Sequence, residues 1–226
     1  MTYWLGMDTA TDVAGVALHD GVAVLEERTW ATRRHTQGLA PAVAEVLRRH
    51  GVAATDLDGV AVAIGPGSYT GLRVGVALAK GLAVGAGVAV VGVPTLDILA
   101  APLSPPVVGR DRRLWALLRA GRGRVVAAAY PPAAGGWPEG DGLVPEELGA
   151  VLGRGAPGDW MAGELTAEER GQALRAGFVV LPPTACLRRP GWLAELGIAR
   201  AQGAPATASD LAHLEPIYPQ PRSTSG

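Results

Sequence analysis

The sequence contains almost no cysteine: among 226 residues, Cys186 carries the one thiol. A single cysteine excludes an internal disulfide framework, and this absence is typical of proteins in a reducing compartment. The opening segment MTYWLGMDTATDV also lacks the basic start of a secretory signal, and Asp8 interrupts the apolar run that such a signal needs. We therefore expect a cytoplasmic protein.

Long hydrophobic runs are scarce as well. The longest stretch without a charged residue, GLAVGAGVAVVGVPTL between Lys80 and Asp97, has sixteen residues. A transmembrane helix needs about 20 residues, and this stretch is interrupted by glycines and by Pro94. It predicts the end of a helix followed by a buried strand, and we expect no membrane contact.

Neither sign of charge dominates, because 20 basic residues face 21 acidic ones and the formal net charge is −1. This balance excludes a global attraction to nucleic acid or to a membrane surface, so any such attraction must be local. Hydrophobic residues make up 48% of the chain and charged residues 18%, as in globular proteins. The length allows one large domain or two small ones.

Apolar runs and helical periodicity predict a mixed α/β protein. Strands are expected at 4–7, 13–18, 57–64, 88–93, 114–118 and 125–130, and helices at 37–50, 69–85, 145–152, 167–176 and 192–202. Two strands joined by a tight turn come first, and strands then alternate with helices, which predicts a mixed sheet with helical crossovers.

A proline-rich break at residues 102–106 divides the chain. We expect a first lobe at 1–102, which carries the partner interface, a smaller and divergent second lobe at 103–218, and a disordered tail at 219–226. The second lobe repeats the outline of the first without a sequence repeat.

The segment GPGSYTGLRVG, at 65–75, places three glycines and a proline around the start of a predicted helix. Ser68 or Thr70 can cap this helix, and its N-terminus is suited to bind an anion. No Walker sequence is present, and a purely structural turn is the favoured explanation. Small residues recur every four positions from Gly67 to Ala83, which predicts close approach of either the protein's own sheet or a partner's helix.

Several motifs together resemble the bacterial TsaB (YeaZ) family. They are the glycine segment with GLAVGAGVAVVGVPTL after it, MDTATDVAGVAL at 7–18, HTQ at 35–37 and LEPIYPQP at 214–221. The resemblance implies an α/β, actin/hexokinase-like (ASKHA, ribonuclease H-like) fold with two lobes and mixed sheets flanked by helices.

The resemblance also implies a role in tRNA modification. Family members are regarded as non-catalytic platforms that bind the paralogous catalytic subunit TsaD, act with the ATPase TsaE, and form homodimers when alone. That assembly transfers a threonylcarbamoyl group to N6 of adenosine 37 in tRNAs that read codons beginning with A. We expect the partner interface on the two first-lobe helices, at Leu39, Val43, Val46, Leu47, Gly71, Arg73, Gly75 and Ala79.

The first hairpin and the glycine segment stand where actin-like ATPases hold phosphates. We expect a vestigial nucleotide site with weak binding or none, at Asp8, Thr9, Thr11, Gly67, Ser68 and Thr70. No cofactor is expected to bind tightly to this chain, whereas ATP or ADP at the interface of the complex remains an option.

Catalytic residues and metal ligands are not expected. TsaD-like relatives hold a metal with an HxxxH pair, whereas the four histidines here stand apart in the sequence. Family members commonly carry Asp-Ala-Arg followed by Gly-Glu at the first strand of the second lobe, and this chain has Arg119–Arg124 there, without an acid. The alternative function is a small-molecule kinase or ATPase, or an M22-like peptidase, that acts alone.

The same departure concentrates positive charge, because residues 109–124 contain six arginines and one acid. We expect a tRNA contact at Arg110, Arg112 and Arg113. A solvated face or internal ion pairs would explain the cluster equally well.

Overall fold

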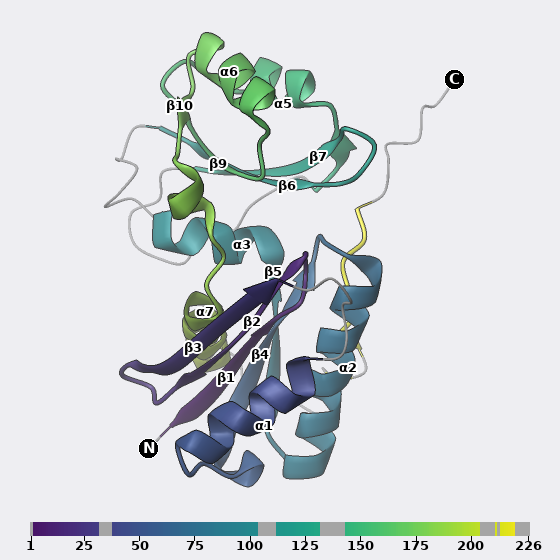
Figure 1. The fold of residues 1–226 in the computed structure, drawn as a ribbon, viewed down its shortest axis with the longest axis vertical. Helices are drawn as coiled ribbons and strands as arrows, with labels where there is room; N and C mark the ends of the chain where they lie inside the picture. Colours follow the sequence, from purple (N-terminus) through teal and green to yellow (C-terminus); the bar gives the residue numbers. More distant parts are fainter. Residues whose placement is uncertain are drawn as a thin grey trace. The chain divides into compact units, whose positions relative to one another are not determined.

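A computed structural model describes residues 2–31, 38–103, 112–131, 143–203, 211 and 213–219 (Figure 1). The HTQ motif, Arg110 and residues 220–226 lie outside this described part. The chain forms two compact units. Unit 1 comprises Met1–Ile98 and Arg189–Ile217, and unit 2 comprises Leu99–Arg188 and Tyr218–Gly226.

Unit 1 is built on a five-stranded mixed sheet in the order β3-β2-β1-β4-β5. Its strands are β1 (Tyr3–Asp8), β2 (Val13–His19), β3 (Val24–Ala31), β4 (Leu57–Gly65) and β5 (Ala89–Pro94). β1, β2 and β3 pair antiparallel through tight turns, whereas β1, β4 and β5 run parallel. Parallel strands need a crossover, and helices supply it here. The predicted strands and the mixed sheet are confirmed.

Helices cover both faces of this sheet (Figure 1). α1 (Leu39–Arg49) and α2 (Tyr69–Ala86) lie on one face and α7 (Pro190–Gly203) on the other. Between α1 and β4 lies the short η1 (Ala54–Asp56), and β5 is followed by α3 (Thr95–Ala100) and η2 (Ala101–Leu103). Because side chains alternate along a strand, β1 sends Leu5 and Met7 toward α1 and α2, and Trp4 and Gly6 toward α7.

α7 shows that the chain is divided differently from our expectation. We assigned residues 103–218 to the second lobe, but Arg189–Ile217 belongs to unit 1. α7 packs closely on β1, because a Cβ at Gly6 would lie 2.4 Å from the carbonyl oxygen of Pro190. A Cβ at Gly197 would lie 2.5 Å from Cβ of Ala61 in β4. Unit 1 is therefore made from both ends of the chain.

Unit 2 holds the second five-stranded sheet, in the order β10-β9-β6-β7-β8. Its elements are β6 (Leu114–Arg119), β7 (Val125–Tyr130), β8 (Pro145–Glu146), α5 (Leu148–Arg154), β9 (Trp160–Gly163), α6 (Ala167–Arg175), β10 (Val179–Val180) and η3 (Pro183–Cys186). Side chains from α5, α6 and one sheet face form its core, with Leu117, Val151 and Met161 fully buried.

The two sheets share one topology. β6 to β10 follow the order and the directions of β1 to β5, since β6 pairs antiparallel with β7 and parallel with β9. α5 and α6 also occupy the places in the chain order that α1 and α2 hold in unit 1. The repeated outline seen in the sequence is thus a repeat of structure, and it confirms the expected two-lobed α/β architecture.

Candidate functional site

The loop after β1 and the loop before α2 form the candidate nucleotide site, and they bind each other. Ser68 donates its backbone N–H to the carbonyl oxygen of Ala10 at 2.7 Å. The hydroxyl of Thr9 donates to the carbonyl oxygen of Gly71 at 2.7 Å. The free amide of Gly71, in the first turn of α2, donates to Oγ of Ser68 at 3.2 Å. These polar groups of the predicted nucleotide site are therefore used within the protein.

The glycines of the loop and helix allow this contact. A Cβ at Gly67 would lie 2.3 Å from the carbonyl oxygen of Ala10, and a Cβ at Gly71 would lie 2.1 Å from that of Thr9. At Gly75 it would lie 2.5 Å from Oγ1 of Thr9. The small residues of this stripe thus admit the protein's own β1–β2 loop.

The remaining residues of the predicted nucleotide site are buried, exposed or engaged in local hydrogen bonds. Asp8 is buried, and its Oδ1 accepts the N–H of Ala10 at 2.8 Å. Thr11 accepts the N–H of Val13 at 3.3 Å, and Thr70 is exposed. Polar groups of Asp8, Thr9, Thr11 and Ser68 are thus engaged in contacts within the protein, and nucleotide binding by these residues stays a prediction.

Most residues of the predicted partner interface are buried within unit 1. Seven of the eight residues point into unit 1; they are Leu39, Val43, Val46, Leu47, Gly71, Gly75 and Ala79. They pack against the sheet or against the β1–β2 loop, and Arg73 alone is exposed. Local amphipathicity is the same for a helix that covers its own sheet and for one that binds a partner, so the sequence could not separate the two.

The outward face of α2 is apolar and rich in small residues. Tyr69 is 58% exposed and Val84 is 80% exposed. Ala77 and Gly81 lie exposed between them, and a Cβ at Gly81 would meet nothing within 4 Å. A helix face of this kind allows the backbone of a second helix to come close. The sequence carries this signal, since small residues stand four positions apart at Ala77, Gly81 and Gly85.

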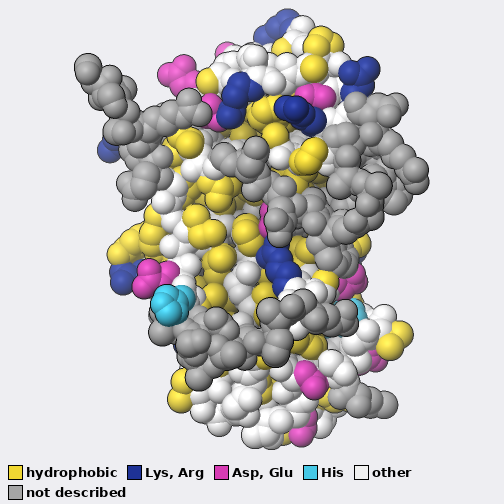
Figure 2. Space-filling model, turned by 180° about the vertical axis from the view of Figure 1, so that it is seen from behind, with side chains coloured by type: hydrophobic (Ala, Val, Ile, Leu, Met, Phe, Trp, Pro, Cys, Tyr) yellow, Lys and Arg dark blue, Asp and Glu magenta, His cyan; other side chains and the backbone are white. Residues whose placement is uncertain are grey.

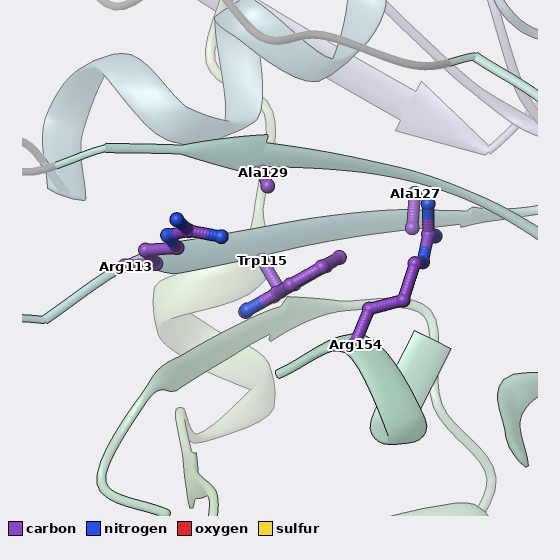
Figure 3. A pocket seen from close by; sticks show the side chains of 5 residues that line it. All are labelled: Arg113, Trp115, Ala127, Ala129 and Arg154. Carbon is purple, nitrogen blue, oxygen red and sulfur yellow. The ribbon is translucent and has the colours of Figure 1, made fainter. Parts of the chain in front are cut away.

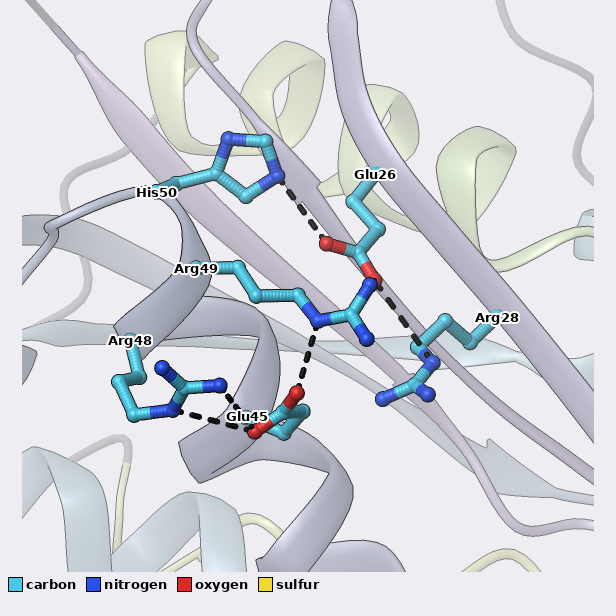
Figure 4. A network of polar contacts seen from close by, with 6 residues as sticks. All are labelled: Glu26, Arg28, Glu45, Arg48, Arg49 and His50. Atoms are coloured by element: carbon cyan, nitrogen blue, oxygen red, sulfur yellow. Dashed lines mark hydrogen bonds and ion pairs between the residues drawn. The ribbon is translucent and has the colours of Figure 1, made fainter.

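The outer end of α1 is polar instead and is tied to β3 (Figure 4). Glu26 of β3 contacts Nε2 of His50 at 3.1 Å and lies 3.7 Å from both Arg28 and Arg49. Arg49 donates to Glu45 at 2.7 Å, and this hydrogen bond, with help from Arg48, holds the pKa of the Glu45 carboxyl below its usual value. The outer surface at this end of α1 is therefore polar, in contrast to the apolar residues exposed on α2.

The arginines of unit 2 have different surroundings, and basic side chains are spread over this unit at the top of Figure 2. Arg112 donates to the carbonyl oxygen of Pro157 at 3.1 Å, so it stabilises a loop. Arg119 pairs with Glu169 at 3.0 Å. Part of the cluster is thus engaged in internal contacts, which was one of the explanations that the sequence left open.

Arg113 and Arg154 border a pocket of about 200 Å³ on unit 2 (Figure 3). Trp115, Ala127 and Ala129 line its apolar wall. The guanidinium of Arg154 lies 5.3 Å from the centre of a Trp115 ring and pairs with Glu146. The indole N–H of Trp115 donates to Asp159 at 3.0 Å. Arg154 is thus paired with an acid, whereas among the described residues no acidic partner is found for the side chain of Arg113.

Neither a metal cluster nor an activated thiol emerges within the described part of the chain. No group of three or more His, Cys, Asp or Glu side chains that could hold a metal ion is found there. The thiol of Cys186 accepts the N–H of Gly163 at 3.2 Å, and burial raises its pKa. A raised pKa keeps a thiol protonated and weakens it as a nucleophile. No helix among the described residues is long and apolar enough to cross a membrane.

Comparison with known proteins identifies the family. The chain is 31% identical over 224 residues to the tRNA threonylcarbamoyladenosine biosynthesis protein TsaB of Escherichia coli K12, an alignment that spans 95% of this chain and 93% of that protein. The chain belongs to the TsaB family. The resemblance seen in the sequence motifs is therefore confirmed over nearly the whole chain.

Solved structures agree with this TsaB assignment. YeaZ from Pseudomonas aeruginosa matches with a TM-score of 0.74 and 27% identity over 96% of this chain and 100% of that one. The ROK hexokinase from Thermus thermophilus matches with a TM-score of 0.50 and 12% identity over 89% of this chain and 100% of that one, which shows the fold alone. The expected actin/hexokinase-like fold is confirmed.

A family model of TsaD, described as tRNA N6-adenosine threonylcarbamoyltransferase, matches residues 28–136. This match covers most of unit 1 and the first hairpin of unit 2. A TsaB-family chain therefore shares this part of its architecture with the family of the transferase.

Proposed function

We propose that this chain is a non-catalytic platform in the assembly that transfers a threonylcarbamoyl group to N6 of adenosine 37 in tRNAs that read codons beginning with A. It binds and stabilises a TsaD-type catalytic subunit and acts with a TsaE-type ATPase. Membership of the TsaB family supports the pathway, and the outward face of α2 supports the role of a platform. A protein that works on tRNA and carries one unpaired cysteine belongs in the cytoplasm.

The proposed platform role rests mainly on one observation. The side chain of Val84 is 80% exposed, and it lies on the same face of α2 as the exposed Ala77 and Gly81. Exposed apolar side chains on a helix gain free energy when a partner removes them from water. The small residues beside Val84 allow a partner's helix to pack at a short distance. The same surface serves a second copy of this chain when the catalytic subunit is absent, which yields a homodimer.

We further propose that the chain alone binds no nucleotide tightly. The hydrogen bonds from Ser68 to Ala10 and from Thr9 to Gly71 would have to break before a phosphate could enter between the loops. ATP or ADP in the assembly would accordingly bind at the interface with a partner. These bonds also weaken the alternative of a kinase or ATPase that acts alone.

Size-exclusion chromatography with light scattering tests the proposed role as a platform. The chain alone should run as a homodimer, and addition of the TsaD-type subunit of the same organism should replace this peak by a heteromer. The variant Val84→Asp should stay folded, because its side chain is exposed, and should lose both assemblies. Leu174→Asp is the matched control, since Leu174 is an apolar side chain of α6 that is 58% exposed in unit 2. Unchanged assembly in the Val84 variant would show that α2 is not the interface.

A further inference from the structure

The turn between β6 and β7 places a charged L-residue in a backbone conformation that glycine normally occupies. Gly121, Arg122 and Gly123 have φ angles of 72°, 51° and 72°. Arg124 donates its N–H to the carbonyl oxygen of Gly121 at 3.0 Å, and Ala120 donates to that of Arg124 at 2.9 Å. Positive φ at both central residues defines a hairpin turn in which Gly, Asn or Asp is preferred.

Arg122 gains nothing visible from this position. Unlike Asn or Asp, arginine has no short polar side chain that bonds the local backbone, so its left-handed conformation costs stability, and no compensating contact is found among the described residues. A Cβ built at Gly121 or Gly123 would meet nothing within 4 Å, and Arg122 itself is exposed. Strain kept at an exposed tip points to a role for the side chain beyond folding.

The acids near the hairpin are occupied by other arginines. Glu169 pairs with Arg119 at 3.0 Å, and Glu164 lies 3.6 Å from Arg188. Among the residues that the structure describes, no acidic partner is found for Arg122 or Arg124. The tip therefore displays positive charge that no acidic side chain of the described residues neutralises.

We propose that the β6–β7 hairpin, through Arg122 and Arg124, binds backbone phosphates of tRNA. The inference rests on the proposed function, which supplies RNA as the substrate, and it names the surface that meets this substrate. A guanidinium donates two parallel hydrogen bonds to a phosphate, and an exposed tip can reach a bulky polyanion that a pocket would exclude. The contact is with the backbone, so it is independent of base sequence. It differs from the contact expected at Arg112, which is engaged with Pro157.

The variant Arg122→Gly separates a role in binding from a role in folding. Glycine removes the strain at positive φ, so the midpoint of thermal unfolding should rise by about 2 °C. The same change removes one cation, so the slope of log K against log salt for tRNA binding should fall by about 1. Arg122→Lys should keep the slope, and Arg175→Gln, which removes one exposed charge from α6, should change it little.

Filter binding of tRNA is measured across a salt series with the complex of this chain and its TsaD-type partner. An unchanged slope for Arg122→Gly, or an equal loss for Arg175→Gln, overturns the hairpin contact. Light scattering on the same samples reports complex formation separately, so loss of the proposed function is recognised by itself. If no complex forms, the same salt series is measured with this chain alone. The inference is then also overturned if the chain alone does not bind tRNA, or if Arg122→Gly leaves the slope of log K against log salt unchanged.

Discussion

Two glycines of α2 predict opposite responses to the same substitution, because Gly71 faces the β1–β2 loop and Gly81 faces open space. Alanine at Gly81 would meet nothing within 4 Å and should stabilise the protein by about 1 kcal/mol through helix propensity. Alanine at Gly71 would place Cβ 2.1 Å from the carbonyl oxygen of Thr9. Since an ordinary contact needs more than 3 Å, the β1–β2 loop would have to move by about 1 Å, and backbone atoms yield less easily than the end of a side chain.

The magnitude for Gly71→Ala follows from three contributions. Overpacking costs roughly 1–3 kcal/mol. Loss of the hydrogen bond from the Thr9 hydroxyl, which accompanies movement of the loop, costs about 1 kcal/mol more. The gain in helix propensity returns about 1 kcal/mol, so the net loss of unfolding free energy is roughly 1–3 kcal/mol.

Thermal unfolding followed by circular dichroism measures both variants. For a chain of this length about 1 kcal/mol corresponds to roughly 2–4 °C, so Gly81→Ala should unfold a few degrees above the parent and Gly71→Ala several degrees below it. If both variants were stabilised to the same extent, the packing of the β1–β2 loop on α2 would be refuted.

Three further changes test other parts of the structure. Asp159→Ala removes the acceptor of the buried Trp115 indole N–H, and chemical denaturation should report a loss of about 1–3 kcal/mol; an unchanged stability would contradict this role. Cys186 should react with iodoacetamide more slowly at pH 8 than a cysteine in an unfolded peptide and accelerate as the pH rises, because burial raises its pKa and only the thiolate reacts; an equal rate at pH 8 would argue against this burial. Ser68→Ala removes the N-cap of α2 and should cost about 1 kcal/mol, with no loss expected from Thr70→Ala, whose side chain is exposed.

The sequence predicted the elements well where local pattern decides the structure. The apolar run at 57–64 became β4 (Leu57–Gly65), and the helix expected at 69–85 became α2 with Ser68 as its cap. These features depend on periodicity and on residues that are neighbours in the chain, so they can be read without knowledge of the fold.

The sequence could not show which face of α2 is covered within unit 1, for a physical reason. Small residues stand four positions apart on this helix both from Gly71 to Ala83 and at Ala77, Gly81 and Gly85, so both rows satisfy the same local pattern. Their difference lies in what stands opposite, and the β1–β2 loop that fills the first row is about sixty residues away in the chain. The packing of α7 on β1 could not be predicted for the same reason, because this contact joins segments that are far apart in the chain.

For the β6–β7 hairpin, the sequence showed the feature but not its detailed contacts. The arginine-rich segment was recognised from composition, but the sequence could not say which guanidiniums are engaged. Backbone angles and ion pairs separate Arg122 and Arg124 at the tip from Arg112 and Arg119, which stabilise unit 2.

The closure of unit 1 by α7 affects how the protein is made. The ribosome synthesises β1 to β5 first. The sheet face that carries Trp4 and Ala61 therefore stays exposed to solvent until Leu193 and Leu196 of α7 have been synthesised. Unit 2 lies between them and can fold in the meantime, because its sheet is contiguous in the chain. The emerging N-terminal half is thus exposed to aggregation for the time needed to translate about ninety residues, and a chain that stops before α7 should be removed by proteases instead of accumulating as a folded fragment.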